Sequence, residues 1–161
     1  MGKLGVKVNR AEGGLGRRNA SPDGDCLLVI KSAVATEFLA LATVAKVFSI
    51  QAVEALGITP SYDDTNSILA HYHASEFFRI NPDGDLHLLL DDGSLTDADF
   101  KTAIKSNDSI RAVGVVRNAA APETIDAEAI QWQGIVDALE EEVLRIDSVF
   151  LEGVITDPET G

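Results

Sequence analysis

The sequence has one cysteine, no long apolar run and no secretion signal, and each absence excludes a class of protein. Cys26 is the only cysteine of the 161-residue chain, so no intrachain disulfide can form, and a reducing cytoplasm is the expected compartment. The chain has no apolar run of about 18 residues, the length that spans a membrane. The first ten residues, MGKLGVKVNR, lack the apolar stretch of a secretion signal. We therefore expect neither a disulfide scaffold nor insertion into a membrane.

The composition is typical of one globular domain. Apolar residues make up 45% of the chain and charged residues 24%. At roughly 150 residues per domain, the length corresponds to one domain, or to one domain with arms. A chain of this size buries enough surface to fold without a structural metal.

Charge is distributed unevenly along the chain. Residues 1–20 carry +4, residues 21–117 carry −7 and residues 118–161 carry −10, which gives the net charge of −13. Such an acidic body repels phosphates, so we expect no nucleic-acid partner. Two interpretations remain open: a solvated surface with a basic terminus, or attraction between the basic arm of one copy and the acidic last third of another.

Residues 1–25 are predicted to form an extended N-terminal arm and linker. Leu4, Val6 and Val8 alternate with mostly polar neighbours, which is a strand pattern on a lightly apolar segment. The stretch 11–25, AEGGLGRRNASPDGD, is rich in residues typical of loops. A segment of this kind is either disordered or pairs with a sheet edge elsewhere.

Residues 26–155 are predicted to form an α/β domain, with 156–161 as a C-terminal tail or truncation point. Strands alternate with helices, which favours a mixed, partly parallel sheet flanked by helices. The expected strands are 26–30, 44–48, 86–90, 110–116 and 148–155, and the expected helices are 35–43, 50–56, about 63–81, 96–105 and about 123–146.

Two of the expected helices carry a periodic pattern. In the helix ending near residue 81, one predicted face contains Leu69, Tyr72, His73, Glu76, Phe77 and Ile80. Pro60 is expected to keep the stretch between Gly57 and this helix extended. The long helix has apolar residues spaced by four and three from Ile125 to Phe150, with acidic residues facing away. We favour docking of this helix on its own sheet over a coiled coil.

No set of residues in the sequence requires a metal, a cofactor or catalysis. His71 and His73 lie two apart, so on a helix they point about 200° apart and cannot bind one ion together. His73 and Glu76 share a face, but two ligands are too few for a metal site. The Gly-rich segment 13–18 does not match a phosphate-binding loop. Cys26 lies within an apolar run and is expected to be buried and inert.

One stretch of the chain resembles a known family. It runs from Phe48 to Leu90 and contains ALGITP at 55–60, then Tyr62 and Asp63, then AHYHASEFFRINPDG at 70–84, followed by a strand. This stretch resembles the sheath subunit of contractile phage tails and related injection systems. Residues 2–18 are similar in type to the extended N-terminal arm of that family. Sheath subunits are usually much longer, so the chain would correspond to a fragment, to a single domain or lobe, or to a reduced relative.

The resemblance implies a mechanical function. Sheath subunits form stacked rings around an inner tube, and their terminal arms add strands to the sheets of neighbours. The implied partners are further copies of the chain and the inner tube protein. The implied location is a virion tail or injection particle assembled in the bacterial cytoplasm. The resemblance implies no catalytic residue, and the contact residues expected from their place in the arm are Leu4, Val6, Val8, Arg10, Arg17 and Arg18.

Two other functions remain open from the sequence. One is a small ligand-binding or enzymatic α/β domain, with a site at the carboxyl ends of its strands and a pocket near His73, Glu76 and His87. The other is an adaptor that binds a basic partner through its acidic helix face.

Overall fold

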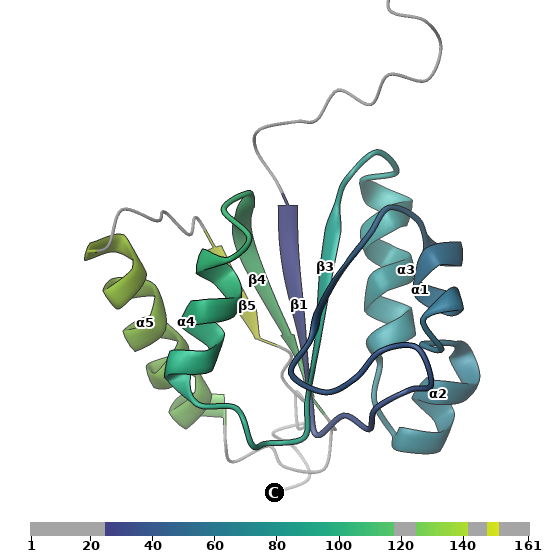
Figure 1. The fold of residues 1–161 in the computed structure, drawn as a ribbon, viewed down its shortest axis with the longest axis horizontal. Coiled ribbons are helices and arrows are strands. Elements are labelled where there is room, and N and C mark those ends of the chain that lie inside the picture. The colour runs from purple at the N-terminus through teal and green to yellow at the C-terminus, as the bar shows by residue number, and fades with distance from the viewer. Residues whose placement is uncertain (1–24, 118–124, 142–147, 152–161) are drawn as a thin grey trace, which may run out of the picture.

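The computed structural model describes residues 25–117, 125–141 and 148–151, which form a sheet between two helical layers (Figure 1). The described strands are β1 (Asp25–Lys31), β2 (Val44–Val47), β3 (Leu86–Asp91), β4 (Ile110–Val116) and β5 (Ser148–Leu151). Their order in the sheet is β2-β3-β1-β4-β5. β1, β3, β4 and β5 run parallel, and β2 pairs antiparallel with β3. The prediction of an α/β fold with a mixed, partly parallel sheet is confirmed.

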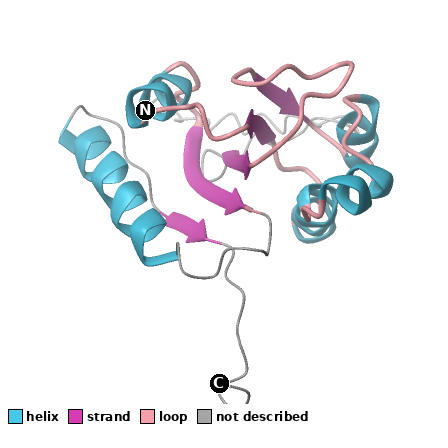
Figure 2. Cartoon of the chain, turned by 90° about the horizontal axis from the view of Figure 1, so that it is seen from below, coloured by secondary structure: helices cyan, strands magenta, loops and turns pink. Residues whose placement is uncertain are grey.

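Helices cover both faces of the sheet. The described helices are α1 (Ile50–Ala55), α2 (Pro60–Asn66), α3 (Ala70–Ile80), α4 (Asp97–Lys105) and α5 (Ile125–Glu141). α1, α2 and α3 pack on one face, and α4 and α5 pack on the other (Figures 1 and 2). None of the helices in the described ranges has the length and apolarity needed to cross a membrane.

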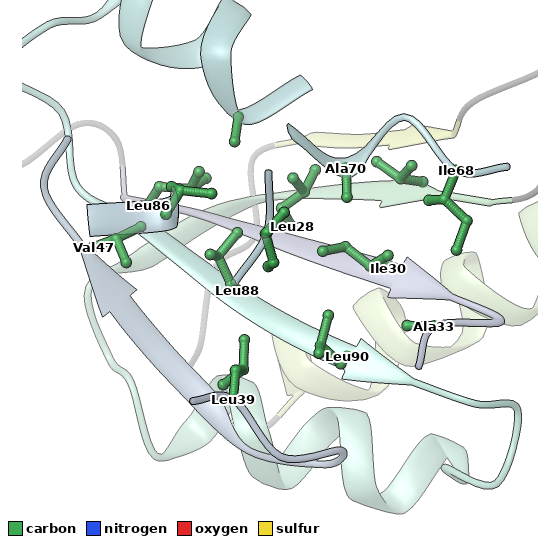
Figure 3. Packing of buried hydrophobic residues seen from close by; sticks show 14 of the residues in the cluster. Leu28, Ile30, Ala33, Leu39, Val47, Ile68, Ala70, Leu86, Leu88 and Leu90 are labelled. Atoms are coloured by element: carbon green, nitrogen blue, oxygen red, sulfur yellow. The ribbon is translucent and has the colours of Figure 1, made fainter. Parts of the chain in front are cut away.

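Each face of the sheet has its own hydrophobic core. Leu28 and Ile30 of β1 join Leu86, Leu88 and Leu90 of β3 under α1 and α3 (Figure 3). The alternate residues of the same strands point to the opposite face, because side chains alternate along a strand. There Leu27, Val29 and Leu89 pack with Phe100 of α4 and Trp132 of α5. Burial on both faces explains why Leu27–Ile30 of β1 and Leu88–Leu90 of β3 are continuous apolar runs.

The predicted helix over residues 35–43 is wrong. This segment is irregular, and the end of β3 holds it on both sides: Ala33 N–H, just before the segment, donates to Asp91 O, and Ala42 N–H, within it, donates to Leu90 O, each at 2.9 Å. The Thr36 hydroxyl oxygen accepts from Leu39 N–H at 2.9 Å. The segment is rich in Ala and Leu, which favour helices. This helix propensity does not outweigh these tertiary contacts.

The single helix predicted to run to about residue 81 is two helices. α2 starts at Pro60, which takes the first helical position behind the Thr59 cap, so Pro60 does not keep the chain extended as expected. α2 ends at Asn66, and the residue that caps its C-terminus, Ser67, has a left-handed φ of 54°. The Asp63 carboxylate accepts from the backbone N–H groups of His71 (2.9 Å) and Tyr72 (3.0 Å), so α2 caps the start of α3.

The buried face of α3 also differs from the predicted one. Ala70, Ala74 and Phe78 are buried against the sheet, whereas Tyr72 is 53% and Ile80 71% exposed. Small alanines face the core because they let the helix lie close to the sheet. On α5, Trp132, Ile135 and Leu139 are buried, so this helix docks on its own sheet as expected.

Candidate functional site

The carboxyl ends of the parallel strands, where α/β proteins commonly bind ligands, carry paired charges. Lys31 at the end of β1 lies 2.9 Å from the carboxylate of Asp91 at the end of β3. The other Asp91 oxygen accepts from the backbone N–H groups of Gly93 (2.8 Å) and Leu95 (3.2 Å). After β4, Arg117 lies 3.4 Å from Glu128 of α5. These contacts hold the ends of β1, β3 and β4 in place.

The sequence left open a pocket near His73, Glu76 and His87. The structure separates these three residues. His73 and Glu76 belong to α3, and Glu76 forms an ion pair with Arg79 at 2.7 Å. His87 of β3 is 2% exposed and contacts Asp25 at 3.2 Å, on the face covered by α4 and α5. The sheet lies between His87 and α3, so these residues do not form a common pocket. Within the described ranges, no group of three or more His, Cys, Asp or Glu side chains is placed to hold a metal ion.

A polar cluster ties the starts of β1 and β3 to the end of the antiparallel strand β2. Lys46 Nζ of β2 lies 3.0 Å from Asp25 and 2.9 Å from Asp85, and His87 Nε2 lies 3.2 Å from Asp25. Burial alone would raise the pKa of Asp25, but hydrogen bonds from Ser109, Lys46 and His87 outweigh burial and lower this pKa. The cluster fixes the start of β1 against β2 and β3.

Replacing Asp25 with Asn should make the free energy of unfolding less sensitive to acid. The folded-state pKa of Asp25 lies below its ordinary value of 3.8, so its contribution is full above that value and is lost as pH falls through the folded pKa. We expect Asp25→Asn to cost about 1 kcal/mol at pH 7. The cost should shrink below pH 3.8, as measured by urea unfolding at pH 7, 5, 4 and 3. Asp64→Asn, at an exposed position of α2, is the control; an equal cost of Asp25→Asn at pH 7 and 3 would contradict the assignment.

Cys26 is half-buried at the start of β1, next to the polar cluster. Burial raises the pKa of its thiol to about 11, an effect that a backbone hydrogen bond from Gly114 only partly offsets. The thiolate is the reactive form, so the expectation of an inert cysteine agrees with this environment.

The raised pKa predicts slow alkylation of Cys26. At pH 8 only about one thiol in a thousand is ionised, so iodoacetamide should react about 100-fold more slowly with the folded protein than with the chain in urea. The rate should rise with pH up to the pKa. A Cys26→Ala, Ser61→Cys variant, which places a thiol at an exposed position, provides the fast control. Equal rates for the folded and unfolded chain would show that burial does not protect Cys26.

A groove lies between β2, β3 and α4, on the face that α4 and α5 cover. Its volume is about 330 Å³. Apolar side chains line the groove on both the sheet side and the α4 side. Its polar side chains come from α4 and the residues that follow α4. The lining residues are Ala42, Val44, Leu89, Leu95, Asp99, Thr102, Ala103, Ser106 and Asn107. The groove has an acidic side chain and no basic one, and it borders the antiparallel edge strand of the sheet.

The predicted contact residues of the arm, Leu4, Val6, Val8, Arg10, Arg17 and Arg18, lie outside the described residues.

Comparisons with known proteins add no family to these observations. A scan against protein-family models, a search of curated proteins and a search of solved structures each found no match for this chain.

Neither the polar cluster nor the groove was predicted from the sequence, although the residues of the cluster carry a signal. The tetrapeptide Pro-Asp-Gly-Asp occurs at 22–25 and again at 82–85, each time before an apolar strand. β1 and β3 are parallel neighbours with Cys26 opposite Leu86, so Asp25 and Asp85 come to the same edge of the sheet. The repeat could have indicated this pairing. The groove had no such signal, because its lining comes from three separate elements.

Proposed function

We propose that the chain is a structural subunit of a contractile phage tail sheath or a related contractile injection system. Copies of it polymerise into stacked rings around an inner tube, and terminal arms donate strands to neighbouring copies. Its partners are further copies of itself and the inner tube protein. Its role is mechanical rather than catalytic, and it acts in a virion tail or injection particle assembled in the bacterial cytoplasm.

The observation that carries the proposal is the edge strand β2, in a chain that also has a separate strand-like segment at residues 3–9. Within the described part of the chain, β2 pairs with β3 alone. The alternating residues Leu4, Val6 and Val8 lie in a basic segment, whereas the rest of the chain is acidic. An unpaired edge and a separate strand segment are the two components of strand addition between subunits.

The residues that carry the resemblance to sheath subunits have structural roles in this fold. Gly57 ends α1 with a φ of +86°, and Ile58 N–H closes the cap on Val53 O at 3.3 Å. Thr59 caps α2, and Asp63 caps α3. Gly84 lies so close to the Asn81 side chain that a Cβ there would clash. These roles support a subunit whose sequence pattern serves its architecture rather than a reaction.

The catalytic alternative has less support. The charged residues at the carboxyl ends of β1, β3 and β4 pair with one another, as Lys31 does with Asp91. Paired and partly buried charges of this kind hold strands and helices together without activating a substrate.

The size of the purified full-length chain tests the proposal. Light scattering and negative-stain microscopy should show multimers that grow with protein concentration into rings or tubes, alone or with added inner tube protein. A chain that stays monomeric at every concentration, even with the tube protein present, would contradict the proposed function.

A further inference from the structure

The outer edge of β2 has the geometry of an acceptor for an added strand. In the described ranges β2 has β3 as its one strand neighbour, from Val44 opposite Leu89 to Val47 opposite Leu86. Its side chains alternate between the two faces: Val44 packs toward α4, whereas Ala45 packs toward α1 and α3. A strand laid beside β2 would continue this alternation on both faces.

The groove lies on one of these faces, directly beside that edge. Val44 and Leu89 of the sheet and Leu95 and Ala103 of the α4 side provide its apolar surface, and Asp99 contributes a carboxylate. Its volume of about 330 Å³ is sufficient for several aliphatic side chains. An incoming strand with apolar residues at every second position would therefore bury them in the groove while its backbone pairs with β2.

We propose that this edge and groove bind residues 3–9 of a second copy of the chain, which places Leu4, Val6 and Val8 over the groove. The inference rests on the proposed function and names the acceptor site for the donated strand. The alternation of apolar residues in 3–9 matches the one-sided apolar surface. Charge also matches, because residues 1–20 carry +4 and the groove has an acidic side chain and no basic one.

The length of the linker is sufficient for donation between copies. Fifteen residues, 10–24, separate the strand segment from β1. Fully extended they span about 50 Å, which exceeds the roughly 40 Å diameter of a domain of this size. An added strand beside β2 of the same copy would lie only about 14 Å from β1, so the linker length also permits binding within one copy. The experiment must therefore distinguish the two arrangements.

Cysteine cross-linking of the full-length chain tests the proposal. In a Cys26→Ala background, Val6→Cys is combined with Thr102→Cys, an exposed position on the α4 side of the groove. Oxidation should give dimers and longer ladders on a non-reducing gel, with a yield that rises with protein concentration. Lys7→Cys with Thr102→Cys is the matched control, because adjacent strand residues face opposite sides. We expect it to cross-link at least tenfold more slowly.

Three results would overturn the proposal. Equal rates for the position 6 and position 7 variants would show that no register is fixed at the groove. A cross-linked monomer whose yield is independent of concentration would place the arm on its own domain. Multimers that form without any cross-link to position 102, or that link equally well to a cysteine at Ser61 on α2, would leave the proposed function intact and exclude this acceptor site.

Discussion

Deletion of residues 1–10 is expected to abolish stable assembly of the chain. The deletion removes Leu4, Val6 and Val8 and the backbone that would pair with a neighbour, so both the apolar contact and the strand hydrogen bonds are lost. The deletion leaves every described element, from β1 at Asp25 onward, in the chain. Light scattering at matched concentration should show multimers for the full chain and only monomers for the deletion variant.

Charge reversal of the arm is the matched control for the deletion. Replacing Arg10, Arg17 and Arg18 with Glu keeps the strand segment but removes its attraction to an acidic partner. This variant should assemble slowly at low salt and still form lasting multimers, because charge steering acts mainly on the rate of association. High salt should reduce the difference in rate from the parent chain. If the deletion variant assembles as well as the full chain, the arm is not the connector between subunits.

Replacement of Phe100 by Ala is expected to be among the most destabilising single changes in the domain. Phe100 is fully buried, and its ring centre lies 5.0 Å from that of Trp132 and 5.0 Å from Lys31 Nζ. Loss of this ring should reduce the free energy of unfolding by about 3–5 kcal/mol. Trp132 is the only tryptophan, so its fluorescence in a urea titration reports the change directly.

Phe38 provides the control for this measurement. Its side chain is 64% exposed, so Phe38→Ala should change the free energy of unfolding by less than about 0.5 kcal/mol. Similar losses for the two variants would show that the core between α4, α5 and the sheet is not packed as described.

The sequence was sufficient to predict the elements whose signals are local. Nearly continuous apolar runs identified β1 and β3, because strands covered on both faces need apolar side chains at most positions. The stop of α1 at Gly57 and the start of α4 after Thr96 followed from capping residues. In each case the residues that determine the element lie within it or next to it.

The failures arise where distant contacts decide the local structure. The 35–43 segment is held by backbone hydrogen bonds from Ala33 and Ala42 to the end of β3, about 50 residues further along the chain. The break between α2 and α3 depends on Asp63 reaching the N–H groups of His71 and Tyr72. The polar cluster and the groove each require three elements to meet, and no periodic pattern in one segment indicates such a meeting.

Electron microscopy of the native assembly tests the central claim most directly. The chain, tagged at its C-terminus, would be produced in its native host, and the particles that carry it would be purified and imaged in negative stain. The account predicts hollow, striated tubes around a narrower inner tube, with the tag repeated along the outer layer. Recovery of the chain only as a monomer, or in particles without a tubular sheath, would contradict the account.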